Sequence, residues 1–172
     1  MGISFHEASV GSYQQIMGGL AGVLEKGAAF AAEQGMDPQD LVLAKLREDM
    51  MPLHFQVVSA CHHSLGALHG MRDGRFSPPS FELDKTYREL QDMVAQTNAG
   101  LAAFGAADAE AIADQSMVFA LGKQEMPFTN QNFLMSFSLP NFYFHATTVY
   151  DILRAQGVPL GKRDFLGQLR MG

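Results

Sequence analysis

Apolar residues recur at steps of three and four along most of the chain, which predicts helices that each bury one face. The first helix begins after Ser4 and Glu7, whose Ser-x-x-Glu spacing is that of a capping box, and ends near Gly35. Its predicted inner stripe consists of Val10, Tyr13, Met17, Leu20, Leu24, Phe30 and Ala31. Four glycines also fall within this helix and indicate either close helix packing or room for a ligand. They are Gly18, Gly19, Gly22 and Gly27.

The next two helices are predicted from a cap and from the same periodicity. Asp37, followed by proline, predicts a short helix over residues 38–46. A second long helix is expected over residues 52–70, with a turn at residues 73–74.

A third long helix follows a break at the Ser-Pro-Pro-Ser stretch. We expect Asp84 to cap it and Gly105 to end it. Its stripe consists of Tyr87, Leu90, Val94, Thr97, Leu101 and Phe104. A helical turn over residues 108–114 is predicted next.

The remaining segments predict a small hairpin, or an irregular insertion in its place, and a fourth long helix. Residues 117–121 and 125–128 alternate around a Gly-Lys turn, and Thr129 is a candidate cap for the helix that follows. Pro140 lies within a helical pattern, where we expect a kink or a break. The fourth long helix is expected over residues 140–156, and the tail after it contains two apolar residues that can pack on the other helices.

Composition and charge narrow the class of protein. Of 172 residues, 47% are hydrophobic and 17% are charged, which is enough for a large core. The net charge of −6 gives no indication of a nucleic-acid-binding surface. The single cysteine, Cys61, excludes an intramolecular disulfide, and no signal peptide or apolar run of about 20 residues is recognisable. We therefore expect one soluble, cytoplasmic domain over residues 1–172, all-α and built as a four-helix bundle, without a nucleic-acid or membrane partner.

Histidines are the main candidates for chemistry, because four of the six lie on the predicted second helix. With about 100° per residue, the buried direction of that helix is set by Leu53, Val57, Ala60, Ser64 and Leu68. His54 lies roughly 60° from it, at the border of the core. The other three, His62, His63 and His69, point away and are expected to be solvated. Cys61 lies on the inner face and is expected to be inert.

On the fourth helix, His145 flanks the inner stripe. That stripe consists of Phe142, Ala146, Val149 and Leu153. Asn141, one turn earlier, is a candidate hydrogen-bond partner of His145. His54 and His145 are thus the two histidines best placed to face the interior, and each can equally be a structural residue that is satisfied by hydrogen bonds.

The fourth helix and the segment after it carry a recognisable set of residues. They are Leu139-Pro140-Asn141-Phe142-Tyr143-Phe144-His145, Thr148, Tyr150, Ile152-Leu153-Arg154, residues 157–162 and Asp164-Phe165-Leu166, with Asp49-Met50-Met51-Pro52-Leu53 and Gln56 earlier in the chain. This pattern resembles a bacterial and fungal family of uncharacterised proteins within the DinB/YfiT-like superfamily. The resemblance implies an up-down-down-up four-helix bundle that often forms homodimers.

The resemblance also implies a divalent metal, zinc or nickel, held by one histidine of the second helix and a His-x-x-x-His pair on the fourth. Some members of the superfamily are thiol-dependent transferases or isomerases. His145 matches the first histidine of that pair, whereas Val149 occupies the position of the second. On the second helix His62 resembles the ligand motif, while the helical wheel favours His54. The candidate metal ligands are therefore His54, His62 and His145.

Two functions remain open from the sequence. One is a divergent metal-dependent enzyme that transfers a thiol-linked small molecule. The other is a non-catalytic, dimeric bundle that binds a small apolar ligand or a protein partner, which the low charge, the eleven methionines and the aromatic residues around position 140 favour.

Overall fold

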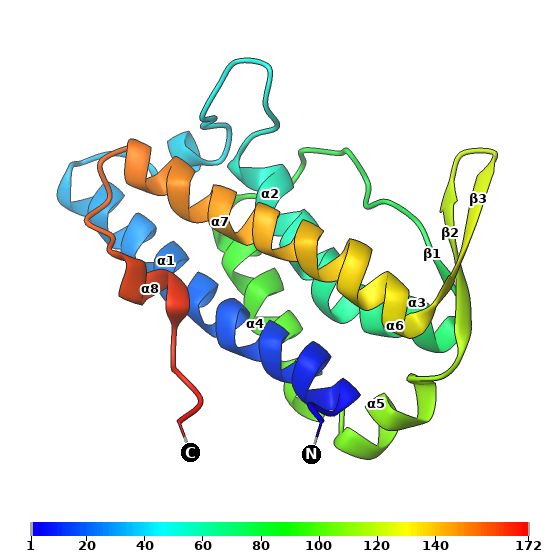
Figure 1. The fold of residues 1–172 in the computed structure, drawn as a ribbon. Helices are drawn as coiled ribbons and strands as arrows, with labels where there is room; N and C mark the ends of the chain where they lie inside the picture. The colour runs from blue at the N-terminus through cyan, green and yellow to red at the C-terminus, as the bar shows by residue number, and fades with distance from the viewer. Residues whose placement is uncertain (1, 172) are drawn as a thin grey trace.

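The computed structural model describes residues 2–171 and is mostly helical (Figure 1). The longest helices are α1 (Ser12–Glu33), α2 (Leu53–Cys61), α4 (Tyr87–Ala103) and α7 (Leu139–Ala155). Shorter helices are α3 (Ala67–Asp73), α5 (Ala106–Ile112), α6 (Asn130–Phe133) and α8 (Lys162–Leu166), with the 3-10 helix η2 (Pro38–Leu41) and the π-helical segments η1 (Glu7–Gly11), η3 (His62–Gly66) and η4 (Leu134–Ser138). None of these helices is long and apolar enough to cross a membrane.

The start and end of the first helical run follow the predicted signals. The N–H of Glu7 donates to Ser4 Oγ, and the N–H of Ser4 donates to the Glu7 carboxylate, both at 3.1 Å. Gly35, two residues after α1 ends, has a φ of +67°, which favours glycine. The cap of α4 differs from the prediction, because Thr86 rather than Asp84 forms a reciprocal capping box with Glu89.

The short helix predicted over residues 38–46 is wrong in length. Asp37 does cap it, by accepting a hydrogen bond from Gln39 N–H at 2.9 Å, but η2 ends at Leu41. The carbonyls of Val42 and Ala44 accept hydrogen bonds from His54 and Leu53. These carbonyls pair across the loop with the start of α2, so the chain folds back instead of continuing as a helix.

The second helical run is longer than predicted. It passes without a break through α2, η3 and α3 to Asp73, and Gly74, with a φ of +76°, ends it in the left-handed conformation. Gly70 therefore lies inside a helix rather than at its end. A Cβ at this position would lie 2.9 Å from a ring carbon of Phe76.

A three-stranded sheet lies beside the helices, so the description as an all-α chain is too simple (Figure 1). The predicted hairpin is confirmed as β2 (Ser116–Leu121) and β3 (Gln124–Thr129), with Gly122 in the turn at a φ of +59°. A short strand, β1 (Arg75–Phe76), pairs in parallel with β2 and was not foreseen.

Pro140 does not break the last helical run. The chain is already helical in η4 and continues through Pro140 into α7. The predicted end of this run at Gly157 is confirmed by a φ of +95°. After it, α8 returns to pack on α1 (Figure 1).

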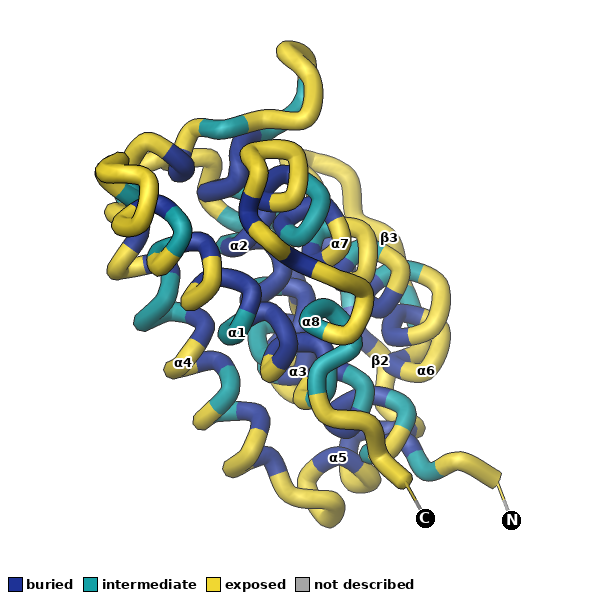
Figure 2. Tube along the Cα trace, turned by 90° about the vertical axis from the view of Figure 1, so that its left-hand side faces the viewer, coloured by how far each residue is buried: buried dark blue, intermediate teal, exposed yellow. Residues whose placement is uncertain are grey.

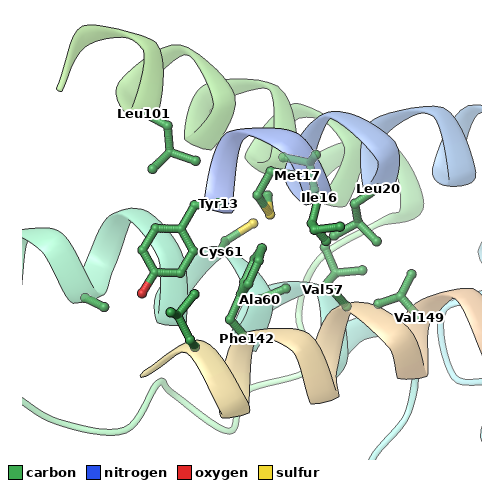
Figure 3. Close-up of a cluster of buried hydrophobic side chains, with 14 of the residues drawn as sticks. Tyr13, Ile16, Met17, Leu20, Val57, Ala60, Cys61, Leu101, Phe142 and Val149 are labelled. Atoms are coloured by element: carbon green, nitrogen blue, oxygen red, sulfur yellow. The ribbon is translucent and has the colours of Figure 1, made fainter. Parts of the chain in front are cut away.

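The core lies where the long helices meet: α1 packs on α4 and α7, and α2 packs on α4 and α7. Buried positions turn inward and exposed ones outward along each of these helices (Figure 2). The predicted stripe of α4 is buried throughout. Tyr13 meets Phe142 edge to face with the ring centroids 4.9 Å apart, and Figure 3 shows both beside Cys61, Val57 and Met17.

Candidate functional site

The run of α2 and η3 is buried on more than one face, which places polar side chains inside the protein. The buried polar side chains include His54, Gln56 and His63, and His63 is only 5% exposed. The prediction that His63 is solvated is therefore wrong. The helical wheel assumed one inner face, whereas the opposite face of this helix is covered by Phe76 of β1 and by Phe137 of η4.

His63 and His145 lie side by side between η3 and α7. Their ring centroids are 5.7 Å apart and their planes differ by 18°. Burial, and to a lesser extent the neighbouring His145 and His62, lowers the pKa of His63 from 6.5 to about 3. Burial lowers the pKa of His145 to about 4. Both rings are therefore neutral near pH 7. The Nδ1 atom of His63 is buried without a hydrogen-bond partner.

Phenylalanine rings surround this histidine pair. Phe76 and Phe137 lie 5.4 and 5.7 Å from the ring of His63. Phe55 and Phe144 lie 5.9 and 5.3 Å from the ring of His145, both edge to face. His145 is only partly buried and Phe144 is 57% exposed, so the pair is closed on the His63 side and approaches solvent on the His145 side.

The side chain of Gln56 connects the pair to the start of α2. Its Oε1 lies 2.7 Å from His145 Nδ1, and its Nε2 donates to the carbonyl of Met51 at 2.9 Å. The partner expected from the sequence was Asn141, but its Nδ2 donates to the carbonyl of Phe137. Gln56 was missed because it is 89 residues from His145, and nothing in local spacing relates the two.

Residues 77–86, which we call the strap, cross α2 without regular structure. His62 Nε2 donates to the carbonyl of Ser77 at 2.6 Å, and Lys85 N–H donates to His54 Nε2 at 3.0 Å. Between these contacts, Phe81 stacks on Phe55 at 5.3 Å with planes 11° apart. His54 and His62 thus hold the two ends of the strap.

The three predicted metal ligands therefore occupy different surroundings. His54 and His62 each use Nε2 to bind the strap, whereas His145 pairs with His63. Within residues 2–171, no group of three His, Cys, Asp or Glu side chains is arranged to hold a metal ion. Val149, at the position of the expected second histidine of the fourth helix, is fully buried in the apolar core (Figure 3). The metal site at His54, His62 and His145 stays a prediction.

Cys61 lies on the inner face of α2, as predicted (Figure 3). Burial raises the pKa of its thiol to about 12, so the thiolate is not formed near neutral pH. The residue is therefore part of the core and not a nucleophile.

Comparison with known proteins assigns the chain to a family. The model of the family described as "Domain of unknown function (DUF1993)" matches residues 5–166. The crystal structure of a DinB family member protein from Shewanella denitrificans, at 1.83 Å resolution, is similar, with a TM-score of 0.79 and 26% sequence identity over 97% of this chain and 94% of that chain. No curated protein matches the sequence. The chain therefore has a DinB-like fold and belongs to the DUF1993 family.

Proposed function

We propose that the protein binds a small, uncharged and largely apolar molecule at the pair formed by His63 and His145. The observation that carries this proposal is the Nδ1 atom of His63, which is buried without a hydrogen-bond partner. An unsatisfied buried polar atom destabilises a protein by about 1–3 kcal/mol, so each one in a folded chain calls for a physical explanation. The ligand would approach the pair from the His145 side, where the ring is only partly buried, and would hydrogen-bond to His145.

The surroundings of the pair favour an uncharged ligand. Its neighbours are four phenylalanine rings, and both histidines are neutral near pH 7, so nothing in this set compensates a ligand charge. Aromatic walls with a few polar atoms are typical of small-molecule sites in proteins. Phe81 of the strap stacks on Phe55 at the border of the site, so movement of the strap would change access to it.

The divalent metal implied by the superfamily, zinc or nickel, does not fit the described residues as a three-ligand centre. His63 and His145 supply two imidazoles, and the neighbouring His62 uses its Nε2 to bind the carbonyl of Ser77. Among residues 2–171, no three His, Cys, Asp or Glu side chains are arranged to hold a metal ion. Two imidazoles alone bind such an ion more weakly than the three that are usual in a zinc site. The proposal therefore includes no metal-dependent step and no thiol-linked transfer.

A titration monitored by NMR tests the proposal. Phenol and benzyl alcohol serve as uncharged apolar probes, with ring resonances of labelled histidines as the readout. We expect saturable shifts of His63 and His145 that are lost in His145→Leu and retained in His69→Leu, since His69 lines a separate hollow with Arg72. The absence of saturable shifts at millimolar probe, or equal binding by His145→Leu, would overturn the proposal. Calorimetric titration with zinc and nickel, done in parallel, tests the metal site independently.

A second candidate is a dimeric interaction module, favoured by apolar side chains exposed on η4 and α7. Met135, Tyr143 and Phe144 are 60%, 39% and 57% exposed. Neighbouring exposed apolar side chains of this kind are typical of protein interfaces. Light scattering after size exclusion should then give a dimer mass for the native chain and a monomer mass for the double variant Tyr143→Ser, Phe144→Ser. A monomer mass for the native chain over the whole concentration range would reject this candidate.

A further inference from the structure

Gln56 makes two hydrogen bonds inside the protein, one of them to His145. It lies on the second turn of α2, is 2% exposed, and places both ends of its amide in hydrogen bonds. One bond holds the carbonyl of Met51 in the segment before α2, and the other holds the ring of His145 on α7. A buried amide with two partners has a fixed orientation.

The Met51 contact decides that orientation. A carbonyl oxygen can only accept, so the amide nitrogen of Gln56 must face Met51 and donate to it, at 2.9 Å. The amide oxygen then faces His145 Nδ1 at 2.7 Å. Because this oxygen only accepts, Nδ1 must carry a proton. In a neutral imidazole the other nitrogen is then unprotonated.

We infer that Gln56 is a positioning residue that holds neutral His145 as the Nδ1–H tautomer, leaving Nε2 as an acceptor for a ligand that carries an O–H or N–H group. This inference rests on the proposed function for the identity of the site, and it narrows the ligand from any uncharged molecule to one that donates a hydrogen bond. Among the described residues, Nε2 of His145 has no hydrogen-bond partner. A molecule such as an ether, which only accepts, has no partner at this nitrogen.

Ring-nitrogen NMR of protein labelled with 15N-histidine tests the tautomer without any ligand. We expect a protonated-type signal for Nδ1 of His145 and an unprotonated-type signal for Nε2 at pH 7. In Gln56→Leu the preference should weaken or reverse towards Nε2–H. Gln96→Leu, at an exposed position of α4, is the matched control and should leave the spectrum unchanged.

The ligand class is tested with phenol, which donates a hydrogen bond, and with anisole, which has a similar shape and does not. We expect phenol to bind the native chain at least tenfold more tightly, and this ratio to fall in Gln56→Leu. An Nε2–H signal in the native chain would overturn the inference, and this result does not depend on the folding of any variant. Equal binding of phenol and anisole would overturn the ligand class. If neither binds while the Nδ1–H signal is observed, the proposed function fails and the positioning role of Gln56 stands.

Discussion

The backbone N–H of Lys85 donates a 3.0 Å hydrogen bond to Nε2 of His54, whose own Nδ1 is buried without a partner. At the other end of the strap the direction is reversed, because His62 donates from Nε2 to the carbonyl of Ser77. A histidine can accept only when it is neutral, whereas it can donate in either charge state. The two ends of the strap therefore respond differently to protonation.

Removal of the acceptor at His54 should loosen the strap. In His54→Leu the Lys85 N–H loses its partner, and a net hydrogen bond of about 1 kcal/mol corresponds to roughly fivefold faster opening. Hydrogen exchange at the Lys85 amide measures this directly. His69→Leu changes a histidine of the same helical run that holds no strap atom, and it should leave exchange at Lys85 unchanged. Unchanged exchange in His54→Leu would show that this bond does not hold the strap.

Stability should fall as the solution is acidified, because the buried histidines remain neutral in the folded chain. The pKa of His63 is lowered from 6.5 to about 3 and that of His145 to about 4, while both regain ordinary values on unfolding. Below pH 6.5 the unfolded chain therefore binds protons that the folded chain does not, and unfolding is favoured. This stability is fully present above about pH 7 and is lost progressively down to about pH 4 for His145 and about pH 3 for His63.

At pH 5 each of these rings should lower the free energy of unfolding by about 2 kcal/mol, from about 1.4 kcal/mol per pH unit below 6.5. Urea denaturation at pH 7 and pH 5 measures the difference. His145→Gln should reduce the difference by about 2 kcal/mol. A native chain equally stable at both pH values would contradict the burial of two neutral histidines.

The long helices and several of their ends follow from signals between near neighbours in sequence, and these could be predicted. The cap of α4 and the ends of η2 and α3 differ from the prediction. The pairing of Ser4 with Glu7, the cap at Thr129 and the stop at Gly157 each depend on residues within one turn. The same holds for the hairpin around Gly122.

The surroundings of the histidines could not be predicted, because they depend on segments that lie far apart in sequence. A helical wheel assigns one inner face, but α2 and η3 are in contact with α4, α7, β1 and the strap. His63 became buried because Phe76 and Phe137 cover the side that the wheel assigned to solvent. Gln56 and His145 have no sequence relation that reveals their contact.

A chain of hydrogen bonds joins α1 to the histidine pair through Tyr13. Ser138 Oγ donates to the carbonyl of His63 at 2.7 Å, so the hydroxyl of Tyr13 must donate to Ser138 Oγ, also at 2.7 Å. All of these atoms are buried. Tyr13→Phe removes only the donor and should lower the free energy of unfolding by about 1 kcal/mol.

Urea denaturation of Tyr13→Phe checks this value against a matched control. Tyr143→Phe removes the same atom from a side chain that is 39% exposed, and it should change stability by less than about 0.5 kcal/mol. Equal effects of the two variants would show that the buried chain through Ser138 adds no stability beyond that of an exposed hydroxyl.

Two adjacent glycines of α1 should respond in opposite ways to the same substitution. A Cβ at Gly19 would lie 2.5 Å from the carbonyl oxygen of Phe165 and 2.9 Å from that of Asp164, both backbone atoms of α8. At Gly18 a Cβ would meet no atom within 4 Å. Gly18→Ala should therefore stabilise the helix by up to about 1 kcal/mol, since alanine is the better helix former.

Gly19→Ala should instead displace α8 from α1, because backbone atoms cannot move aside as a flexible side chain can. Loss of this contact removes the packing of Phe165 on Tyr150, whose ring centroids are 6.1 Å apart. We expect a lower melting temperature for Gly19→Ala, a higher one for Gly18→Ala, and faster proteolysis near residues 162–166 only in the former. If Gly19→Ala is as stable as Gly18→Ala, α8 is not packed at this distance, and the glycine serves neither close packing nor the position of the C-terminal helix.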